Sequence, residues 1–435
     1  MSFLSRCFVV SGFLFAAALT ACSTGGGSSP PAPSSPATQP PQGLAGMFDH
    51  VIVIVQENRT VDNMFNGFLG ADTVTTGKNG TKTVPLVPVP FQPSAGHDHS
   101  YSAFVADYNN GAMNGFDHDT PKTTSYAYVR RSDTSNYWSL ASRFTLSDEV
   151  FQMNMGPSYA AHVNLVAAQG GYPYALAGNP TPNVRAGCLG NNTVDVVDLR
   201  TTYPAKQSLA TACTDMPTIF DLLDRKGLTW RYYAPPAGMG LNLWSAPDFV
   251  KHIALGPDHA NLVNDETRIL DDIANRNLPN VSYVVPDSCW SDHPRDSPND
   301  PQGGPKWVAE ITNAVGASPY WPRTLLLVTW DDWGGWYDHV APPVLSADQL
   351  GFRVPLLIIS AYPRSAGAVD HHQRTQASIL SAIETIFSLG SLGQLDTKTD
   401  DLASDFRYGA NPIAYGTALP SERPPPSEKC PLPSE

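Results

Sequence analysis

The sequence predicts an α/β protein with a mainly parallel central sheet, flanked by helices and carrying loop-rich insertions. Short apolar runs rich in β-branched residues alternate along the chain with segments of helical periodicity. Two of these runs, Val51–Val55 and Leu325–Trp330, end abruptly in carboxylates, as buried parallel strands do where their carboxyl ends open onto a site. With 435 residues, 42% of them apolar and 10% aromatic, the chain can bury a large core.

The charge of the chain argues against a nucleic-acid partner. Its formal net charge is −13 at pH 7. A protein that binds a phosphate backbone needs basic surface to neutralise it, and the sequence has no basic stripe. An acidic protein can still bind one phosphate group through a metal ion and a few histidines.

The N-terminus has the features of an export signal. One cation, Arg6, precedes the apolar stretch Phe8–Ala18, and the following Leu19–Cys22 (LTAC) resembles a bacterial lipobox. We therefore expect residues 1–21 to be a lipoprotein signal peptide and Cys22 to be lipidated. The protein would then be an exported bacterial lipoprotein of the outer membrane, the periplasm or the cell surface. The alternative is an ordinary secretory signal that is cleaved elsewhere.

Composition divides the rest of the chain into three parts. Residues 22–46 are rich in Pro, Gly and Ser and should form a flexible tether, so the chain reaches a membrane only through its lipid anchor. Residues 47–418 contain the apolar runs and are the expected catalytic domain, and residues 419–435 form a proline-rich tail. The sequence does not indicate an oligomeric state.

Four cysteines remain after those of the signal peptide and the lipidation site. An even number in an exported protein indicates two disulfides. We expect Cys188 to pair with Cys213, because both lie in one loop-rich insertion. This leaves Cys289 to pair with Cys430.

The expected elements follow in order along the catalytic domain. Val51–Val55 is the first strand, and residues 60–135 form a large loop-bearing insertion with a helical segment near Ser102–Tyr108. Helices are expected at Tyr137–Ser142, Ala160–Gln169, Asp215–Lys226, Pro305–Ala314 and Gln376–Phe387. Further strands are expected at Thr145–Phe151, Thr229–Tyr233, Val281–Val285, Leu325–Trp330 and Val354–Ser360.

Two of these strands end in ligand-type side chains. Glu57 and Asn58 follow the first strand, and Asp331 and Asp332 follow Leu325–Trp330. Adjacent aspartates after a core strand repel each other unless positive charge lies between them. If the two strand ends meet, they form an oxygen-rich site for one divalent metal ion. Calcium, magnesium and manganese suit such a site, and zinc or iron becomes possible if a histidine joins it.

A third segment supplies a candidate nucleophile. In residues 154–170, NMGPSYAAHVNLVAAQG, a Gly-Pro turn precedes Ser158 at the N-cap position of an alanine-rich helix. The hydroxyl would lie beside unpaired N–H groups and the positive end of the helix dipole, which suits binding and attack of a phosphate. The alternative is a serine that only caps the helix. His162, one turn later, is expected to be structural.

Histidines beside aspartates supply further polar groups. His99, His293 and His339 each follow an aspartate in loop sequence flanked by Gly or Pro. A neutral imidazole can ligate a metal, and a protonated one can donate to phosphate oxygens or to a leaving oxygen. Any one of them alone would read as a solvated loop histidine.

Five segments in this order resemble the bacterial phosphoesterase family that contains non-haemolytic phospholipase C and a respiratory-burst-inhibiting acid phosphatase. They are QENRTVDNMF, HDHSYSAFVADYNNGAMNGF, NMGPSYAAHVNLVAAQG, PDSCWSDHP and TLLLVTWDDWGGWYDHVAPP. The similarity runs from about Phe48 to Phe406. It implies a sheet like that of alkaline phosphatase, with a single nucleophile beside metal.

The resemblance also implies roles for individual residues. The metal ion would be held by Glu57, Asn58, Ser158, Asp331 and Asp332. The phosphoryl group would be bound by Asn58, His99, His252, His293 and His339. Ser158 would be the nucleophile that forms a phosphoserine, with His99 and His293 also catalytic and His293 the first choice to protonate the leaving group.

Three functions remain open at this point. Phospholipase C members commonly have threonine and a downstream Pro-Asn-Arg near the nucleophile, where this chain has Ser158 and Ala160-Ala161-His162. We therefore expect an acid-phosphatase-like enzyme for phosphomonoesters. The alternatives are a phospholipase C for phosphodiesters such as phosphatidylcholine, with tryptophans forming an apolar groove, and an inactive surface binding protein on the same scaffold.

Overall fold

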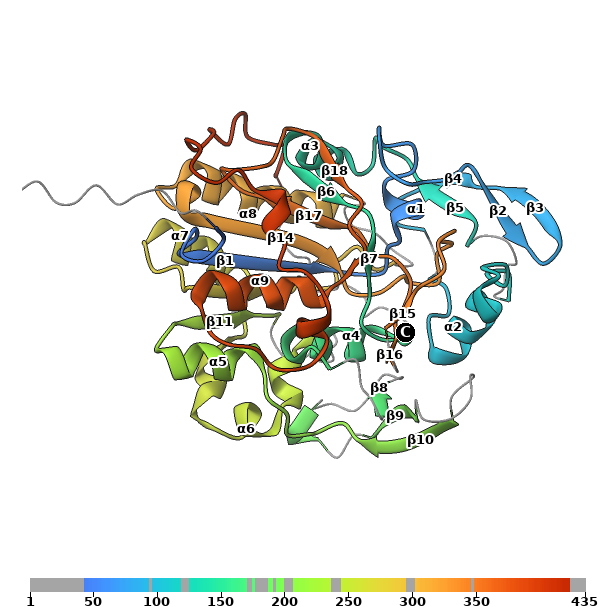
Figure 1. Ribbon diagram of the computed structural model, residues 1–435, viewed down its shortest axis with the longest axis horizontal. Helices are drawn as coiled ribbons and strands as arrows, with labels where there is room; N and C mark the ends of the chain where they lie inside the picture. The colour runs from blue at the N-terminus through green and yellow to red at the C-terminus, as the bar shows by residue number, and fades with distance from the viewer. Residues whose placement is uncertain are drawn as a thin grey trace, which may run out of the picture. The chain divides into compact units, whose positions relative to one another are not determined.

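The apolar runs of the sequence meet in one eight-stranded sheet, which is the centre of the computed structural model (Figure 1). In spatial order its strands are β12 (Leu262–Val263), β11 (Trp230–Tyr233), β13 (Val281–Val284), β1 (His50–Gln56), β14 (Thr324–Trp330), β17 (Leu356–Ile359), β6 (Thr145–Ser147) and β18 (Ala368–Asp370). Only β17 runs antiparallel to its neighbours, so the predicted mainly parallel sheet is confirmed.

The strands are apolar on both faces because each face is covered by a core. In β1, Val51, Val53 and Val55 belong to one hydrophobic cluster, whereas Ile52 and Ile54 belong to the other. This alternation follows from the two-residue period of a strand. A sheet buried on both faces is what a continuous apolar run predicts.

Helices form a layer over each face, as Figure 1 shows. One layer consists of α4 (Ser158–Ala167), α5 (Ile219–Lys226) and α9 (Ala377–Phe387), whose apolar residues join the first cluster. The other consists of α3 (Ser135–Arg143), α7 (Arg268–Ala274) and α8 (Gly303–Ala317), whose apolar residues join the second.

The predicted helices and strands lie close to their expected positions. The main differences are at the starts of helices. The helix expected from Asp215 begins at Ile219, because Thr218 and Asp221 form a capping box there. The helix expected from Ala160 begins at Ser158, after Pro157.

The insertion expected over residues 60–135 contains more regular structure than predicted. It holds α1 (Val61–Met64), α2 (Tyr101–Tyr108), β2 (Thr76–Asn79), β3 (Lys82–Pro85), β4 (Val87–Val89) and β5 (Ala127–Val129). Other short elements are β7 (Val150–Phe151), β8 (Tyr174–Leu176), β9 (Thr193–Asp198), β10 (Lys206–Thr211), α6 (Lys251–Ala254), β15 (Val344–Leu345), β16 (Asp348–Gln349) and β19 (Arg374–Thr375).

The structure describes residues 43–93, 96–118, 125–169, 174–176, 187–190, 193–198, 206–235, 244–294, 302–345 and 348–422. Within them Cys188 and Cys213 form the predicted disulfide. The second predicted pair includes Cys430, which lies outside these residues, as do the signal peptide and Cys22. None of the helices that the structure describes has the length and apolar character that crossing a membrane requires.

Candidate active site

The two acidic strand ends lie side by side because β1 and β14 are neighbours. Their register pairs Gln56 with Trp330, so the residues that follow leave the sheet at the same edge. The pairing continues past the strands, where Asp331 N donates to Gln56 O over 2.9 Å. The predicted meeting of Glu57-Asn58 with Asp331-Asp332 is therefore found.

Tight backbone geometry holds the two ends together. Asn58 has a φ of 62°, in the left-handed region that Asn tolerates better than most residues. Its N–H donates to Asp331 Oδ1 over 2.9 Å. Gly334 has a φ of 60°, and a Cβ there would lie 2.4 Å from Asn58 Cβ, so glycine is needed for this close approach.

Ser158 is the first residue of α4, and its hydroxyl does not cap the helix. Its Oγ instead lies within donating distance of two carboxylates, Glu57 Oε2 at 3.2 Å and Asp332 Oδ2 at 3.3 Å. All three side chains are fully buried. This places the candidate nucleophile against both acidic strand ends, which the helix-capping alternative does not predict.

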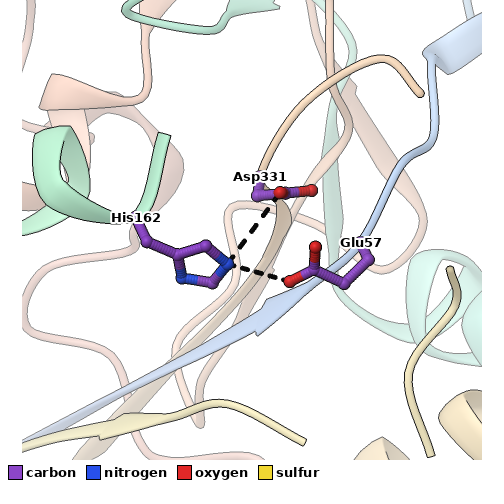
Figure 2. A group of neighbouring side chains, drawn as sticks. All are labelled: Glu57, His162 and Asp331. Carbon is purple, nitrogen blue, oxygen red and sulfur yellow. Dashed lines mark hydrogen bonds and ion pairs between the residues drawn. The ribbon is translucent and has the colours of Figure 1, made fainter. Parts of the chain in front are cut away.

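His162 joins the same group, although the sequence predicted only a structural role for it. Its Nε2 lies 2.8 Å from Glu57 Oε1 and 3.9 Å from Asp331 Oδ2 (Figure 2). The available signal was its spacing, since residues four apart on a helix share a face and His162 follows Ser158 by four. Burial lowers the pKa of His162 to about 4, partly offset by the charge of Asp331.

His99 and His293 lie beside each other, with ring centroids 6.0 Å apart. His99 Nε2 is 3.3 Å from Asn58 Nδ2, which ties this imidazole to the β1 end. His293 Nδ1 is 2.9 Å from the carbonyl of Pro294, so Nδ1 carries the proton and Nε2 faces no hydrogen-bond partner. Burial, then the neighbouring His99, lowers the pKa of His293 to about 3.

The donor set fits a divalent cation. Asn58 Oδ1 and Asp331 Oδ2 are buried oxygens with no hydrogen-bond partner, a costly arrangement unless a ligand satisfies them. Burial, then the charge of Asp331, raises the pKa of Asp332 well above its usual range. A cation between the carboxylates would relieve this repulsion. Glu57, Asn58, Ser158, Asp331 and Asp332 are the residues that would hold it.

Two of the predicted histidines contact other acidic groups. His252 is partly exposed and lies 2.5 Å from Asp215 and 3.0 Å from Asp221. His339 Nδ1 lies 2.6 Å from Asp62, next to the buried Arg353. In the described part of the chain, neither makes a contact with Ser158 or with the acidic strand ends.

Buried polar residues behind the site were not predicted. Gln56 Oε1 accepts from Asp292 N over 3.0 Å, and Asp292 Oδ2 accepts from Tyr137 and Trp330 over 2.9 and 2.7 Å. These bonds hold the loop of His293 to the ends of β1 and β14. Gln152 likewise accepts from Trp333 N and donates to the carbonyl of Asn154, joining the aspartate loop to the segment before Ser158.

Comparisons with known proteins indicate the family of the chain. A model of the phosphoesterase family matches residues 48–390. The hemolytic phospholipase C of Pseudomonas aeruginosa is 25% identical over 420 residues, covering 78% of this chain and 53% of that protein. Non-specific phospholipase C1 of Arabidopsis thaliana is 24% identical, covering 85% of this chain and 72% of that protein.

A solved structure also resembles this one, a protein in the alkaline phosphatase superfamily from Vibrio parahaemolyticus. The TM-score is 0.40 and the identity 12%, over 82% of this chain and 72% of that one. The chain spans about half the length of the P. aeruginosa relative, or 53% of it. The family model covers most of the chain, and its span includes Ser158 and both acidic strand ends. The chain therefore belongs to the phosphoesterase family.

Proposed function

We propose that this protein hydrolyses phosphate esters with a divalent metal ion, through a phosphoserine at Ser158. The observation that carries the proposal is the position of the Ser158 hydroxyl. It is fully buried at a helix start, within 3.3 Å of two carboxylates that come from different strand ends. A serine that only stabilised the fold would not require acidic neighbours from both strands.

The cation would be held by Glu57, Asn58, Ser158, Asp331 and Asp332. When bound, it would supply positive charge that stabilises phosphoryl oxygens and favours the ionised Ser158 hydroxyl. Asn58, His99 and His293 would bind and orient the phosphoryl group. His252 and His339 contact carboxylates elsewhere, so we assign them no direct part.

The reaction would take two steps. Ser158 Oγ attacks phosphorus, the bond to the leaving oxygen breaks, and the serine proton passes through His293 Nε2 to that oxygen. Nε2 is the atom for this transfer because Nδ1 is engaged with Pro294. Water then attacks the phosphoserine from the vacated side, and its proton returns to Ser158 as phosphate leaves. Catalysis would rest mostly on positioning and charge compensation.

Phosphomonoesters are our first choice of substrate, on the sequence near Ser158. Phosphodiesters are the second candidate, because the relatives in the comparison are phospholipases C. The tryptophans that could have formed an apolar groove for a diester do not support the second candidate. Five of them are buried in the core: Trp290, Trp307, Trp321, Trp333 and Trp336.

The test replaces Ser158 by alanine and measures turnover of p-nitrophenyl phosphate and of phosphatidylcholine between pH 5 and 8. We expect kcat to fall at least about a thousand-fold on the preferred substrate. Acid quenching of the wild-type reaction should trap phosphate on Ser158, detected by mass spectrometry. Near-normal turnover by the variant would contradict the nucleophile assignment.

The same assays separate the remaining alternatives. The wild-type protein should turn over one substrate class far faster than the other, which identifies the ester. Treatment with a chelator should abolish turnover, and re-addition of a divalent ion should restore it. A protein that turns over neither ester and binds no ion would be the inactive surface binder.

A further inference from the structure

We propose that His162 is a direct nitrogen ligand of the cation, so that the site prefers zinc or ferrous iron over calcium and magnesium. This inference rests on the proposed function only in that a cation is bound at the acidic strand ends. It adds a residue to the ligand set and narrows the class of metal.

The first support is the position of the ligand atoms. One oxygen each of Glu57 and Asp331 and the Nε2 of His162 all lie within 4.8 Å of one another, and all three residues are buried. Figure 2 shows the three side chains converging from β1, β14 and α4. Ligand atoms at about 2.0–2.2 Å from one ion lie roughly 3–3.5 Å apart, and the observed separations of 2.8 and 3.9 Å lie on either side of this range.

The second support is an unsatisfied oxygen at the same place. Asp331 Oδ2 is buried without a hydrogen-bond partner, and His162 Nε2 is its neighbour at 3.9 Å, too far for a hydrogen bond. A cation between these two atoms would satisfy the oxygen and would replace the contact of Nε2 with Glu57 Oε1, which is 2.8 Å long. The orphaned oxygen therefore lies on the side of the site that His162 Nε2 faces.

The third support is the fixed orientation of the imidazole. The ring of Trp244 stacks on that of His162, with centroids 6.4 Å apart and an angle of 27° between the planes. Trp244 is itself fully buried. His162 is anchored on α4 four residues after Ser158, so the helix presents the proposed ligand and the nucleophile on one face. This leaves the imidazole little freedom to turn away from the acidic strand ends.

The ligand set then indicates the class of metal. Oxygen ligands alone suit calcium, magnesium and manganese, whereas imidazole favours zinc, iron, copper and nickel. One nitrogen added to several carboxylates shifts the preference away from calcium and magnesium and toward zinc and ferrous iron. The competing arrangement keeps His162 outside the metal shell, donating from Nε2 to Glu57 as it does without an ion.

The decisive measurement is pulsed electron paramagnetic resonance of Mn²⁺ bound to the whole, metal-stripped protein. Mn²⁺ serves as the probe because it is paramagnetic and accepts both ligand types. We expect nitrogen modulation from one coordinated imidazole, and its replacement by the ¹⁵N pattern in protein made with ¹⁵N-histidine. His162→Gln should lose the signal, and His252→Gln, the matched control outside the site, should keep it.

Metal selectivity gives a second measurement by titration calorimetry. The ratio of Zn²⁺ to Ca²⁺ affinity should fall at least tenfold in His162→Gln and stay unchanged in His252→Gln. Stoichiometric Mn²⁺ binding without nitrogen modulation in the wild-type protein would overturn this inference alone, whether or not the variants fold. If the wild-type protein binds no divalent ion at all, the metal part of the proposed function fails with it.

Discussion

Asp292 makes several of the buried hydrogen bonds that support the candidate site. It accepts hydrogen bonds from Tyr137 and Trp330, and its backbone carbonyl accepts from the buried guanidinium of Arg59 over 2.7 Å. Burial lowers the pKa of Arg59 to about 10, and the charge of Asp292 acts against that fall. Asp292 therefore both positions His293 and compensates a buried cation.

We predict that Asp292→Asn lowers the free energy of unfolding by about 2 kcal/mol, because a charged acceptor of two buried donors is lost. Urea denaturation monitored by circular dichroism measures this, provided that the m-value is unchanged. Tyr137→Phe removes one of the two donors and should cost about 1 kcal/mol. Equal effects of the two substitutions would contradict a special role for the Asp292 charge.

Among the residues of the candidate site, the sequence predicted those that lie directly after a strand or at the start of a helix. Glu57, Asp332 and Ser158 come together because β1, β14 and α4 end or begin at one edge of the sheet. The contact of His162 with Glu57 was not predicted, because His162 is one polar residue inside an apolar helix. Asp292 was missed as a support because its partners lie 38 and 155 positions away along the chain.

The turn after β14 requires a glycine at position 334. A Cβ at Gly334 would meet Asn58 at 2.4 Å, and its φ of 60° strains any other residue. We expect Gly334→Ala to cost about 3 kcal/mol, from backbone strain plus displacement of the β1 end, and to weaken metal binding. Thermal unfolding and metal titration measure the two effects.

Gly390 offers a matched control for this substitution. Its φ is 89°, but a Cβ there would have nothing within 4 Å. Gly390→Ala should therefore cost only the strain, about 1–2 kcal/mol, and leave metal binding unchanged. If both variants bound metal as the wild type does, close packing at Gly334 would not be what holds the strand ends together.

Helix α9 contains a carboxyl that should make stability depend on pH. Burial, then the charge of Asp396, raises the pKa of Glu384 from 4.5 to about 8. Between pH 4.5 and about 8, Glu384 is therefore protonated in the folded state and ionised in the unfolded state. The stabilisation is complete below pH 4.5 and is lost as pH rises through this window, by roughly 1.4 kcal/mol per pH unit at most.

Glu384→Gln cannot ionise, so its unfolding free energy should be less dependent on pH than that of the wild type. We expect the variant to be the more stable of the two at pH 8 and the difference to shrink toward pH 5. Chemical denaturation at several pH values provides the comparison. Parallel curves for the two proteins would show that Glu384 titrates normally.

The central strands were predictable as continuous apolar runs, and helices such as α5 were predictable from their helical apolar period. The direction of β17 was not, because a buried strand reads the same whether its neighbours are parallel or antiparallel. Helix starts moved where capping decides them, as at Thr218, whose side chain and N–H both pair with Asp221. The insertion before α3 was read as loop because its strands are only three or four residues long.

At the scale of the whole molecule, the N-terminal address is a prediction from the sequence. We expect Cys22 to carry lipid and the tether over residues 22–46 to separate the enzyme from the membrane. Metabolic labelling with an alkyne fatty acid should mark the wild-type protein, and Cys22→Ala should abolish the label without changing turnover by the folded domain. Labelling that persisted in the variant would indicate that another residue is modified.

The order of strands in the sheet has a consequence for folding during synthesis. β1 pairs only with β13 and β14 within the central sheet, through partners such as Val281 and Leu325 for Val51. The ribosome makes the N-terminus first. Most of the chain must therefore be synthesised before β1 has a neighbouring strand to pair with. Pairing over such separations is slow. The carboxylates that follow β1 and β14 thus come together only after β14 has been synthesised, so the nascent chain has no assembled site before that point.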